Sequence, residues 1–212
     1  METQYVSFSG RGGRDGRAKY IAEQFPEYLN GKVLDVGCDT RRLKSLMPEL
    51  DYVGIDIGGE PDIRINLEEV DRLPFDDRQF QCVTCTDVLE HIDCLHHIFN
   101  ELVRVCDRHL IISLPNCWNA LRSRLARGAG DIQWYGLPPE KPVDRHKWFF
   151  NASDIVSFMQ DQQQRHPLRV VRFLANVRPG VSNRLRRAVY PPQMRYLNRY
   201  SHSVWTILER TD

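Results

Sequence analysis

The chain has 212 residues and carries 29 Lys and Arg against 28 Asp and Glu, which gives a formal net charge of +1. This length fits one domain with a single core, and a hydrophobic content of 42% is ordinary for a globular protein. No apolar run reaches the ~18 residues of a membrane span, and the polar N-terminus is unlike a signal peptide. We therefore expect a cytoplasmic protein without a transmembrane span, whose oligomeric state the sequence does not predict.

Apolar runs and turn residues predict strands that alternate with helices along most of the chain. Residues 1–15 are rich in Gly and Arg, and we expect them to be flexible or to close over a ligand. The predicted strands lie near 32–36, 52–56, 62–66, 80–85, 108–114, 168–175 and 202–209, and the predicted helices lie near 16–29, 40–48 and 94–105 and from Ser153 onward. This alternation predicts an α/β domain with a mostly parallel sheet.

The six cysteines, at positions 38, 82, 85, 94, 106 and 117, do not form a metal-binding pattern. Cys82 and Cys85 match C-x-x-C, but no second pair lies nearby. Odd spacing on a strand points the two side chains to opposite faces, which does not suit a shared zinc ion. We expect small buried hydrophobic residues in a reducing compartment.

The most informative feature is a pair of apolar runs that end in Gly37 and in Asp56. Asp56 falls nineteen positions after Gly37, with a helical segment between them. In a nucleoside-binding α/β half, a carboxylate at the tip of the second strand accepts hydrogen bonds from ribose hydroxyls. An ionised Asp56 accepts at two oxygens and therefore suits a ribose diol.

The turn at 37–42 indicates which nucleoside cofactor is bound. It has one glycine, and Asp39 stands where a second would be, whereas a dinucleotide site needs three glycines around a pyrophosphate. Asp39 would repel a pyrophosphate. S-adenosylmethionine carries a sulfonium, an amino acid end and no phosphate, so this turn favours it.

Two later segments, 73–80 and 82–92, complete an ordered set of motifs that runs over 33–116. They resemble the LPF-x-D-x-x-F-D and D-V-L-E-H signature of class I S-adenosylmethionine-dependent methyltransferases. The resemblance implies a single domain with a Rossmann-like, seven-stranded, mostly parallel sheet, an antiparallel last strand, helices on both faces and a lid insertion after strand five. It also implies that the cofactor is bound by Asp35, Gly37, Cys38, Asp56, Ile57, Asn66, Leu67, Thr86 and Asp87.

Three positions depart from the family pattern. Asp39 stands where the first turn usually has glycine, Asn66 replaces the acid after the third strand, and Gln81 replaces an Asp before strand four. The amide oxygen of Asn66 can still accept a hydrogen bond from the adenine amine, so this contact is weakened without being abolished. A catalytically inactive relative therefore remains an alternative.

Residues 117–150 form a long connection that follows the carboxyl end of strand five. Such a connection is usually functional, because α/β sheets bind ligands at this edge. We predict a substrate lid; the alternative is a helical insertion that packs on the sheet. His146 is the predicted general base, since histidine accepts protons near neutral pH. Alternatively, His146 fixes the loop through backbone hydrogen bonds.

A second candidate cluster consists of Asp87, Glu90 and His91, whose i, i+3, i+4 spacing would place them on one helical face. Some methyltransferases that act on quinone precursors or RNA ends resemble this chain here and hold magnesium with an acid-x-x-Glu-His set. Mg²⁺ prefers oxygen ligands, so we expect no metal and interpret the segment as a helix cap that orients the cofactor's methionine end. For His96 and His97, we expect surface positions.

The stretch 162–208 has nine Arg and no Lys, Asp or Glu, so it carries +9 against +1 for the whole chain. It includes an Arg-rich insertion at 176–200, and its arginines lie at 165, 169, 172, 178, 184, 186, 187, 195 and 199. Interleaved tyrosines resemble a nucleic-acid patch, but lipid headgroups, an anionic acceptor or the acidic remainder of the protein would also fit. We predict an anionic partner or substrate.

Together these features predict methyl transfer from S-adenosylmethionine to a small-molecule or lipid-like acceptor of anionic character. One alternative is a nucleic-acid methyltransferase that uses the Arg-rich segment 165–199, and another is a non-catalytic binding protein. Residues 114–117 lack the D/N-P-P-aromatic motif of enzymes that methylate base amines, which argues against that chemistry.

Overall fold

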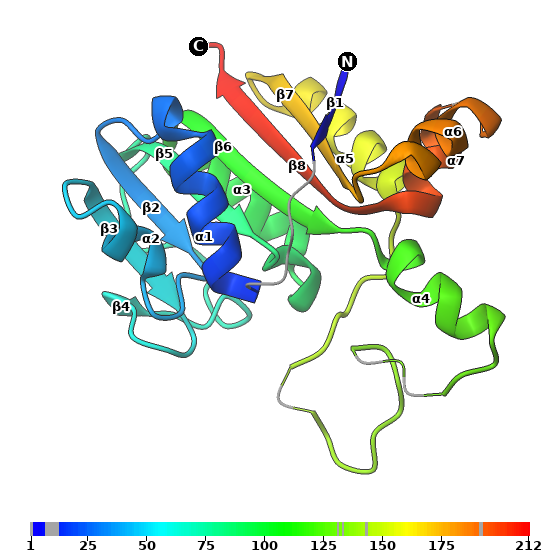
Figure 1. The fold of residues 1–212 in the computed structure, drawn as a ribbon. Helices are drawn as coiled ribbons and strands as arrows, with labels where there is room; N and C mark the ends of the chain where they lie inside the picture. The colour runs from blue at the N-terminus through cyan, green and yellow to red at the C-terminus, as the bar shows by residue number, and fades with distance from the viewer. Residues whose placement is uncertain (1, 7–12, 131, 133, 143, 191–192) are drawn as a thin grey trace.

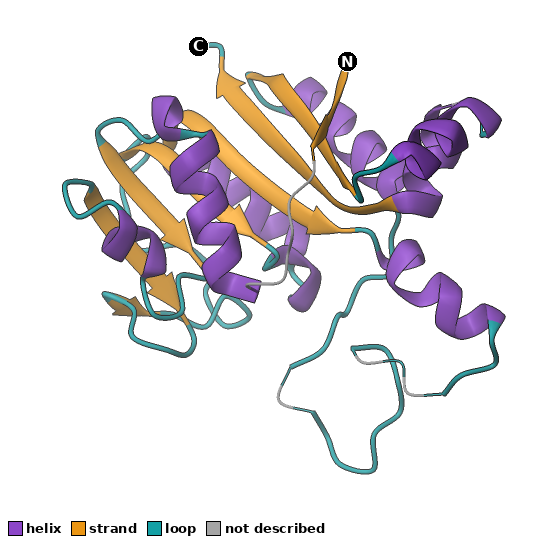
Figure 2. Cartoon of the chain, viewed as in Figure 1, coloured by secondary structure: helices purple, strands orange, loops and turns teal. Residues whose placement is uncertain are grey.

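The computed structural model describes residues 2–6, 13–130, 132, 134–142, 144–190 and 193–212 (Figure 1). A twisted sheet forms the central layer, and helices cover both of its faces (Figure 2). Within these ranges, no helix is long and apolar enough to span a membrane.

The sheet has eight strands in the order β1-β7-β8-β6-β5-β2-β3-β4. Their bounds are β1 Thr3–Val6, β2 Lys32–Val36, β3 Asp51–Asp56, β4 Ile63–Arg64, β5 Phe80–Thr86, β6 Cys106–Pro115, β7 Leu168–Val177 and β8 Ser201–Arg210. β8 is antiparallel to both of its neighbours, whereas the other paired strands are parallel. The predicted fold class is confirmed, and all seven predicted strands are present.

The eighth strand, β1, was not predicted, because Thr3–Val6 lies in the segment that we expected to be flexible. It pairs in parallel with the edge strand β7, and Tyr5 packs with its ring centroid 6.1 Å from that of Tyr196. A short polar run forms a strand here because the exposed edge of β7 supplies its hydrogen-bonding partners. Residues 7–12, which belong to the same predicted segment, lie outside the described residues.

The helices are α1 Gly13–Gln24, η2 Pro26–Tyr28, α2 Arg42–Leu46, η3 Leu89–His91, α3 Leu95–Val105, α4 Cys117–Ala126, α5 Ala152–Arg165, α6 Val181–Val189 and α7 Gln193–Tyr200. The helix predicted at 16–29 is divided, because Pro26 has no amide hydrogen with which to continue α1. α1 and α2 cover one face of the sheet, and α3 and α5 cover the other (Figure 1).

Each face of the sheet has its own buried core. Ile21 of α1 and Phe25, which directly follows α1, pack on one face, whereas Phe99 of α3 and Met159 of α5 belong to the core on the other. Cys82 and Cys85 contribute to different cores, as strand alternation predicts. All six cysteines are free, and burial raises the pKa of the Cys82 and Cys85 thiols well above the usual value. The interpretation of the pair as buried hydrophobic residues is therefore confirmed.

Two insertions depart from this layered arrangement. The first is α4, followed by residues 127–150, which extend from the domain as a long loop (Figure 2) and are called the projecting loop below. The second is the helix pair α6 and α7 between β7 and β8, which corresponds to the predicted Arg-rich insertion. α4 packs against α7, so the two insertions adjoin one another.

Candidate active site

The candidate site begins at the carboxyl end of β2, where the chain turns sharply at Gly37. Strand order reverses here, because β3 lies on one side of β2 and β5 on the other. Open α/β sheets bind ligands at such a switch point. Gly37 has φ +79°, and a Cβ on it would lie 2.3 Å from Cγ2 of Val88. Only glycine fits, because the side chain of Val88 occupies the place of a Cβ and the backbone has a positive φ.

Asp56 ends β3 directly beside this turn. Its Oδ2 accepts the amide N–H of Asp39 at 2.8 Å, and its Oδ1 accepts the amide N–H of Gly58 at 2.9 Å. These two bonds fix the carboxylate between two loops. Each carboxylate oxygen has a second lone-pair direction, so Asp56 retains capacity to accept ribose hydroxyls.

Asp39, the departure from the family's glycine, has φ +49°. Asp tolerates this left-handed conformation better than most residues. Its backbone packs so closely on Gly59 that a Cβ there would lie 2.4 Å from the Asp39 carbonyl oxygen. The residue lines a small cavity of about 30 Å³ below the turn and does not line the main cavity.

The main cavity has a volume of about 1060 Å³ and lies along the carboxyl edge of the sheet. Seven of the nine predicted cofactor residues line it, namely Gly37, Asp56, Ile57, Asn66, Leu67, Thr86 and Asp87. The other two, Asp35 and Cys38, line the small cavity. The structure therefore brings the nine residues to one corner of the sheet. Seven of them line the main cavity, and Asp35 and Cys38 lie beneath the turn at the small cavity.

Asp35 supports the turn from beneath. Its buried carboxylate accepts the Tyr52 hydroxyl at 2.8 Å and the Thr84 hydroxyl at 2.7 Å. Burial raises the pKa of this carboxyl group, although both hydrogen bonds oppose the shift. Asp35 therefore joins the interiors of β2, β3 and β5 and positions the turn that follows it.

Arg17 is a cavity residue that sequence reasoning did not find. It lies on α1 and lines both cavities, and its Nη1 lies 3.2 Å from Oδ2 of Asp87. The other oxygen, Oδ1 of Asp87, accepts the Ser113 hydroxyl at 2.6 Å. Arg17 occurs in an arginine-rich run, so nothing in the sequence distinguishes it from its neighbours.

The end of the projecting loop closes one side of the main cavity. The loop residues that line this side are Lys141, Pro142, Asp144, Arg145 and Lys147. Oδ1 of Asp144 lies 2.6 Å from Nδ1 of His91. Nζ of Lys147 lies 2.5 Å from Oε1 of Glu68 and 2.9 Å from Oδ2 of Asp93. These contacts hold the segment over the cavity. α4 packs as a helical insertion against α7 and β8, and the substrate-lid role of 117–150 stays a prediction.

His146 lies next to the main cavity but does not line it. Its ring stacks on Trp134 at a centroid distance of 5.3 Å and lies 4.6 Å from the ring of His91. Burial and the neighbouring His91 lower the pKa of His146 to about 4. The imidazole is therefore neutral at physiological pH.

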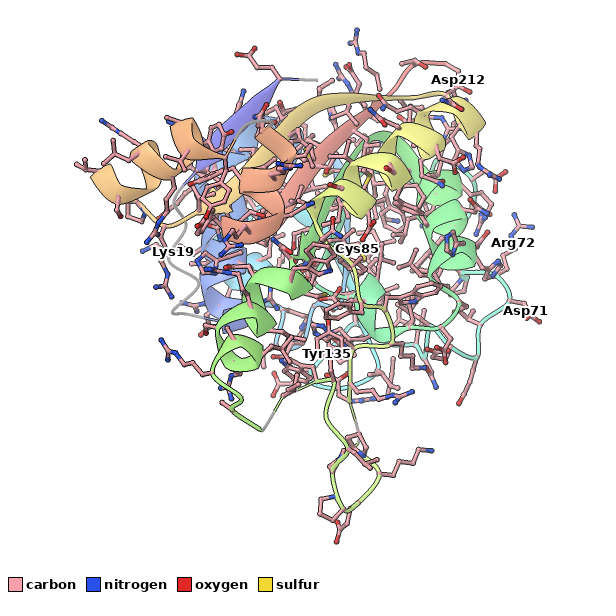
Figure 3. The ribbon with its side chains drawn as sticks, turned by 90° about the vertical axis from the view of Figure 1, so that its right-hand side faces the viewer. Lys19, Asp71, Arg72, Cys85, Tyr135 and Asp212 are labelled. Carbon is pink, nitrogen blue, oxygen red and sulfur yellow. The ribbon has the colours of Figure 1, made fainter. Side chains whose placement is uncertain are left out.

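A hydrogen bond to Tyr135 engages one ring nitrogen of His146. Nδ1 lies 2.7 Å from the Tyr135 hydroxyl, which itself donates to Sγ of Cys117 at 2.6 Å. Nδ1 of His146 is therefore engaged with the Tyr135 hydroxyl in either tautomer of the ring. Tyr135 belongs to the projecting loop and lies where that loop meets the body of the domain (Figure 3).

Glu90, His91 and His146 form one cluster, in which one ligating atom from each lies within 4.8 Å of the others. Glu90 is 1% exposed, and its Oε2 has no hydrogen-bond partner among the described residues. Burial raises the pKa of Glu90 well above the usual value. Two imidazoles and one carboxylate fit a divalent transition metal better than Mg²⁺.

Asp87 does not join this cluster, although the sequence grouped it with Glu90 and His91. The segment forms the short turn η3, and Asp87 has φ +53° and contacts Arg17 and Ser113 instead. The third member, His146, comes from the projecting loop and could not be identified from spacing. His96 and His97 are exposed, as expected.

The comparisons with known proteins agree with this geometry. A family model described as a methyltransferase domain matches residues 14–163, which is more than half of the chain. The chain belongs to this methyltransferase family. The expectation of S-adenosylmethionine as the cofactor of a class I enzyme is thereby confirmed at the level of the family. No curated protein matches the sequence.

Solved structures share the fold at low sequence identity. An S-adenosylmethionine-dependent methyltransferase from Archaeoglobus fulgidus has a TM-score of 0.58 and 16% identity, over 94% of this chain and 95% of that chain. Magnesium protoporphyrin IX methyltransferase from Synechocystis PCC 6803 has a TM-score of 0.54 and 18% identity, over 93% and 81%. The small RNA methyltransferase HEN1 has a TM-score of 0.59 and 20% identity, over 92% of this chain and 25% of that chain.

Proposed function

We propose that this protein transfers a methyl group from S-adenosylmethionine to a small-molecule or lipid-like acceptor of anionic character. The observation that carries the proposal is the convergence of seven predicted cofactor residues on one cavity at the switch point of the sheet. A volume of about 1060 Å³ exceeds what a single drug-sized ligand fills, so the cavity has room for cofactor and acceptor together.

Different residues of the chain bind different parts of the cofactor. Asp56 accepts the ribose hydroxyls, and Asn66 faces the adenine side, where its Oδ1 already accepts the Glu68 N–H at 3.1 Å and shapes the loop. Asp87 and Arg17 provide paired charges of opposite sign for the amino acid end of the cofactor. Gly37 lets the turn pass close to Val88 at the edge of the cavity.

The bound cofactor supplies an electrophilic methyl group on a sulfonium, so the protein must mainly align the acceptor and exclude water. The segment 141–147 excludes solvent on one side of the cavity and presents the exposed cations Lys141 and Arg145 to an anionic acceptor. His146, which lies beside the cavity, accepts the proton when the acceptor is a hydroxyl. Its low pKa makes it a weak base, which suits an acidic hydroxyl better than an aliphatic one.

Glu90, His91 and His146 also fit a divalent transition metal, which would supply Lewis-acid stabilisation to an acceptor oxygen. The proposed base mechanism does not need it.

Calorimetric titration of the protein with S-adenosylmethionine and S-adenosylhomocysteine tests the proposal directly. We expect saturable binding of both ligands, unchanged by a chelator. Methylation of phenolic or carboxylated small molecules then identifies the acceptor class, with His146→Asn lowering turnover and leaving cofactor affinity intact. Absence of cofactor binding would favour a non-catalytic protein, and activity lost to chelator and restored by Mn²⁺ or Zn²⁺ would replace the base by a metal.

A further inference from the structure

Helix α6 carries an apolar face that is exposed to solvent. Val181, Leu185 and Val189 follow one another at a spacing of four, so they share one face of the helix. This face is directed to solvent, with exposed fractions of 72%, 64% and 72%. A surface helix normally directs such a face toward the core.

Two arginines of α6 contact aromatic rings of neighbouring elements. The guanidinium of Arg186 lies 5.2 Å from the ring centroid of Tyr200, and that of Arg187 lies 4.2 Å from the ring of Tyr5. These cation–π contacts attach the helix to α7 and β1 through its cationic side. Both arginines are themselves exposed, as is the aliphatic face.

Helix α4 continues the same surface. Arg122 of α4 stacks on Tyr200 at 5.0 Å, the same ring that Arg186 contacts from α6. α4 exposes Trp118 and Leu125, with exposed fractions of 48% and 57%. α4, α6 and α7 lie together at one end of the molecule, away from β4 (Figure 1). The surface thus combines aliphatic and aromatic side chains.

Cations surround these apolar side chains. Arg178, Arg184, Arg195 and Arg199 on the α6–α7 side are exposed, as are Arg124 and Arg127 near the end of α4. No Asp or Glu occurs anywhere between residues 162 and 208. An apolar stripe bordered by arginines is the composition that binds at the interface of an anionic bilayer, where apolar groups enter the acyl boundary and cations contact headgroups.

We infer that α4 and α6 form a docking surface for an anionic lipid bilayer. Valine and leucine cannot stack on bases, so the centre of the surface does not suit single-stranded nucleic acid. A symmetric dimer through α6 would bring arginines against the same arginines, which is unfavourable. A bilayer satisfies both the apolar and the cationic groups.

The surface is joined to the candidate site by the chain itself. α4 leads directly into the projecting loop, whose far end lines the main cavity. Docking would therefore place the cavity near lipids and would select an amphiphilic acceptor. The docking itself is independent of the proposed function, because vesicle binding needs neither cofactor nor turnover.

Flotation of the full chain with lipid vesicles tests the inference. We expect binding to vesicles of phosphatidylcholine mixed with phosphatidylglycerol, much weaker binding to phosphatidylcholine alone, and loss of affinity as salt rises. A variant with Val181→Ser, Leu185→Ser and Val189→Ser should bind on the order of a hundredfold more weakly, since three aliphatic side chains no longer leave water. Arg184→Gln with Arg195→Gln should weaken binding mainly at low salt.

Leu46→Ser is the matched control, because Leu46 is an exposed leucine on α2, outside this surface. It should bind vesicles like the parent, and circular dichroism should show that all variants are folded. Vesicle binding that survives the triple serine change would overturn the inference. So would RNA binding without vesicle binding, or a concentration-dependent dimer that the serine changes dissociate while vesicles have no effect.

Discussion

The region from β2 to β5 and the region formed by α4, the projecting loop, α6 and α7 are organised differently. In the first, each functional residue ends a strand or begins the turn after it, so strand pairing alone brings the residues together. In the second, contacts join residues that are far apart in the chain: Asp144 meets His91 across 53 positions, and Lys147 meets Glu68 across 79. The proposed cofactor side is thus built by neighbouring strands, and the proposed acceptor side is built by contacts between residues that are far apart in the chain.

Asp56→Ala tests the proposed cofactor side most strongly. The variant loses the ribose acceptor and the two amide hydrogen bonds that fix the turn. Charge-assisted hydrogen bonds contribute about 1.5–3 kcal/mol each, so we expect cofactor affinity to fall by at least about a hundredfold. Calorimetry measures this, with Asp51→Ala at the exposed start of the same strand as the control. Parent-like affinity in the Asp56 variant would contradict the ribose assignment.

Gly37→Ala tests whether the turn needs glycine for space as well as for conformation. The new Cβ would collide with Val88, and the residue would be held at positive φ. We expect the free energy of unfolding to fall by about 2–4 kcal/mol and cofactor binding to be lost. Gly128→Ala is the control, because Gly128 also has positive φ but nothing lies within 4 Å of its added Cβ. Equal effects in chemical denaturation would show that only backbone strain matters.

The dependence of stability on pH tests the proposed acceptor side through His146. Because the folded-state pKa is lowered to about 4, the unfolded chain binds more protons between that value and the ordinary histidine pKa of 6.5. Stability from this group is complete above about pH 6.5 and is lost as pH falls toward 4. After allowance for partial exposure, we expect a loss of about 1–2 kcal/mol.

Denaturant unfolding at neutral pH and near pH 4.5 should show this loss in the parent and a smaller one in His146→Asn. The substitution keeps a side-chain amide that can donate to Tyr135 but removes the titrating ring. An unchanged difference between the two pH values would place the titrating group elsewhere.

Asp39→Gly should have the smallest effect and concerns a departure within the proposed cofactor side. Glycine relieves the positive φ, and the side chain of Asp39 lines the small cavity beneath the turn. We therefore expect cofactor affinity to be preserved or improved by a few-fold. Asp39→Asn, which also tolerates this conformation, serves as the comparison. A marked loss in calorimetry would mean that Asp39 itself contacts the ligand.

The sequence predicted the sheet and the cofactor corner because both follow from short-range patterns. Apolar runs placed seven strands, and the spacing from Gly37 to Asp56 placed the nucleoside corner, since the ends of adjacent parallel strands always meet at one edge. The amphipathic pattern of 94–105 likewise predicted α3 to within a residue. Each of these depends on residues that are neighbours in the chain or in adjacent strands.

Tertiary structure alone decided the remainder. β1 forms only because β7 offers an open edge, Arg17 reaches Asp87 only because α1 lies across the sheet, and His146 meets Glu90 only because the projecting loop folds back. The outward face of α6 is the clearest case, because its sequence predicts an amphipathic helix of either orientation. The tyrosines of α7 and β1 contact its arginines, and its aliphatic face stays exposed.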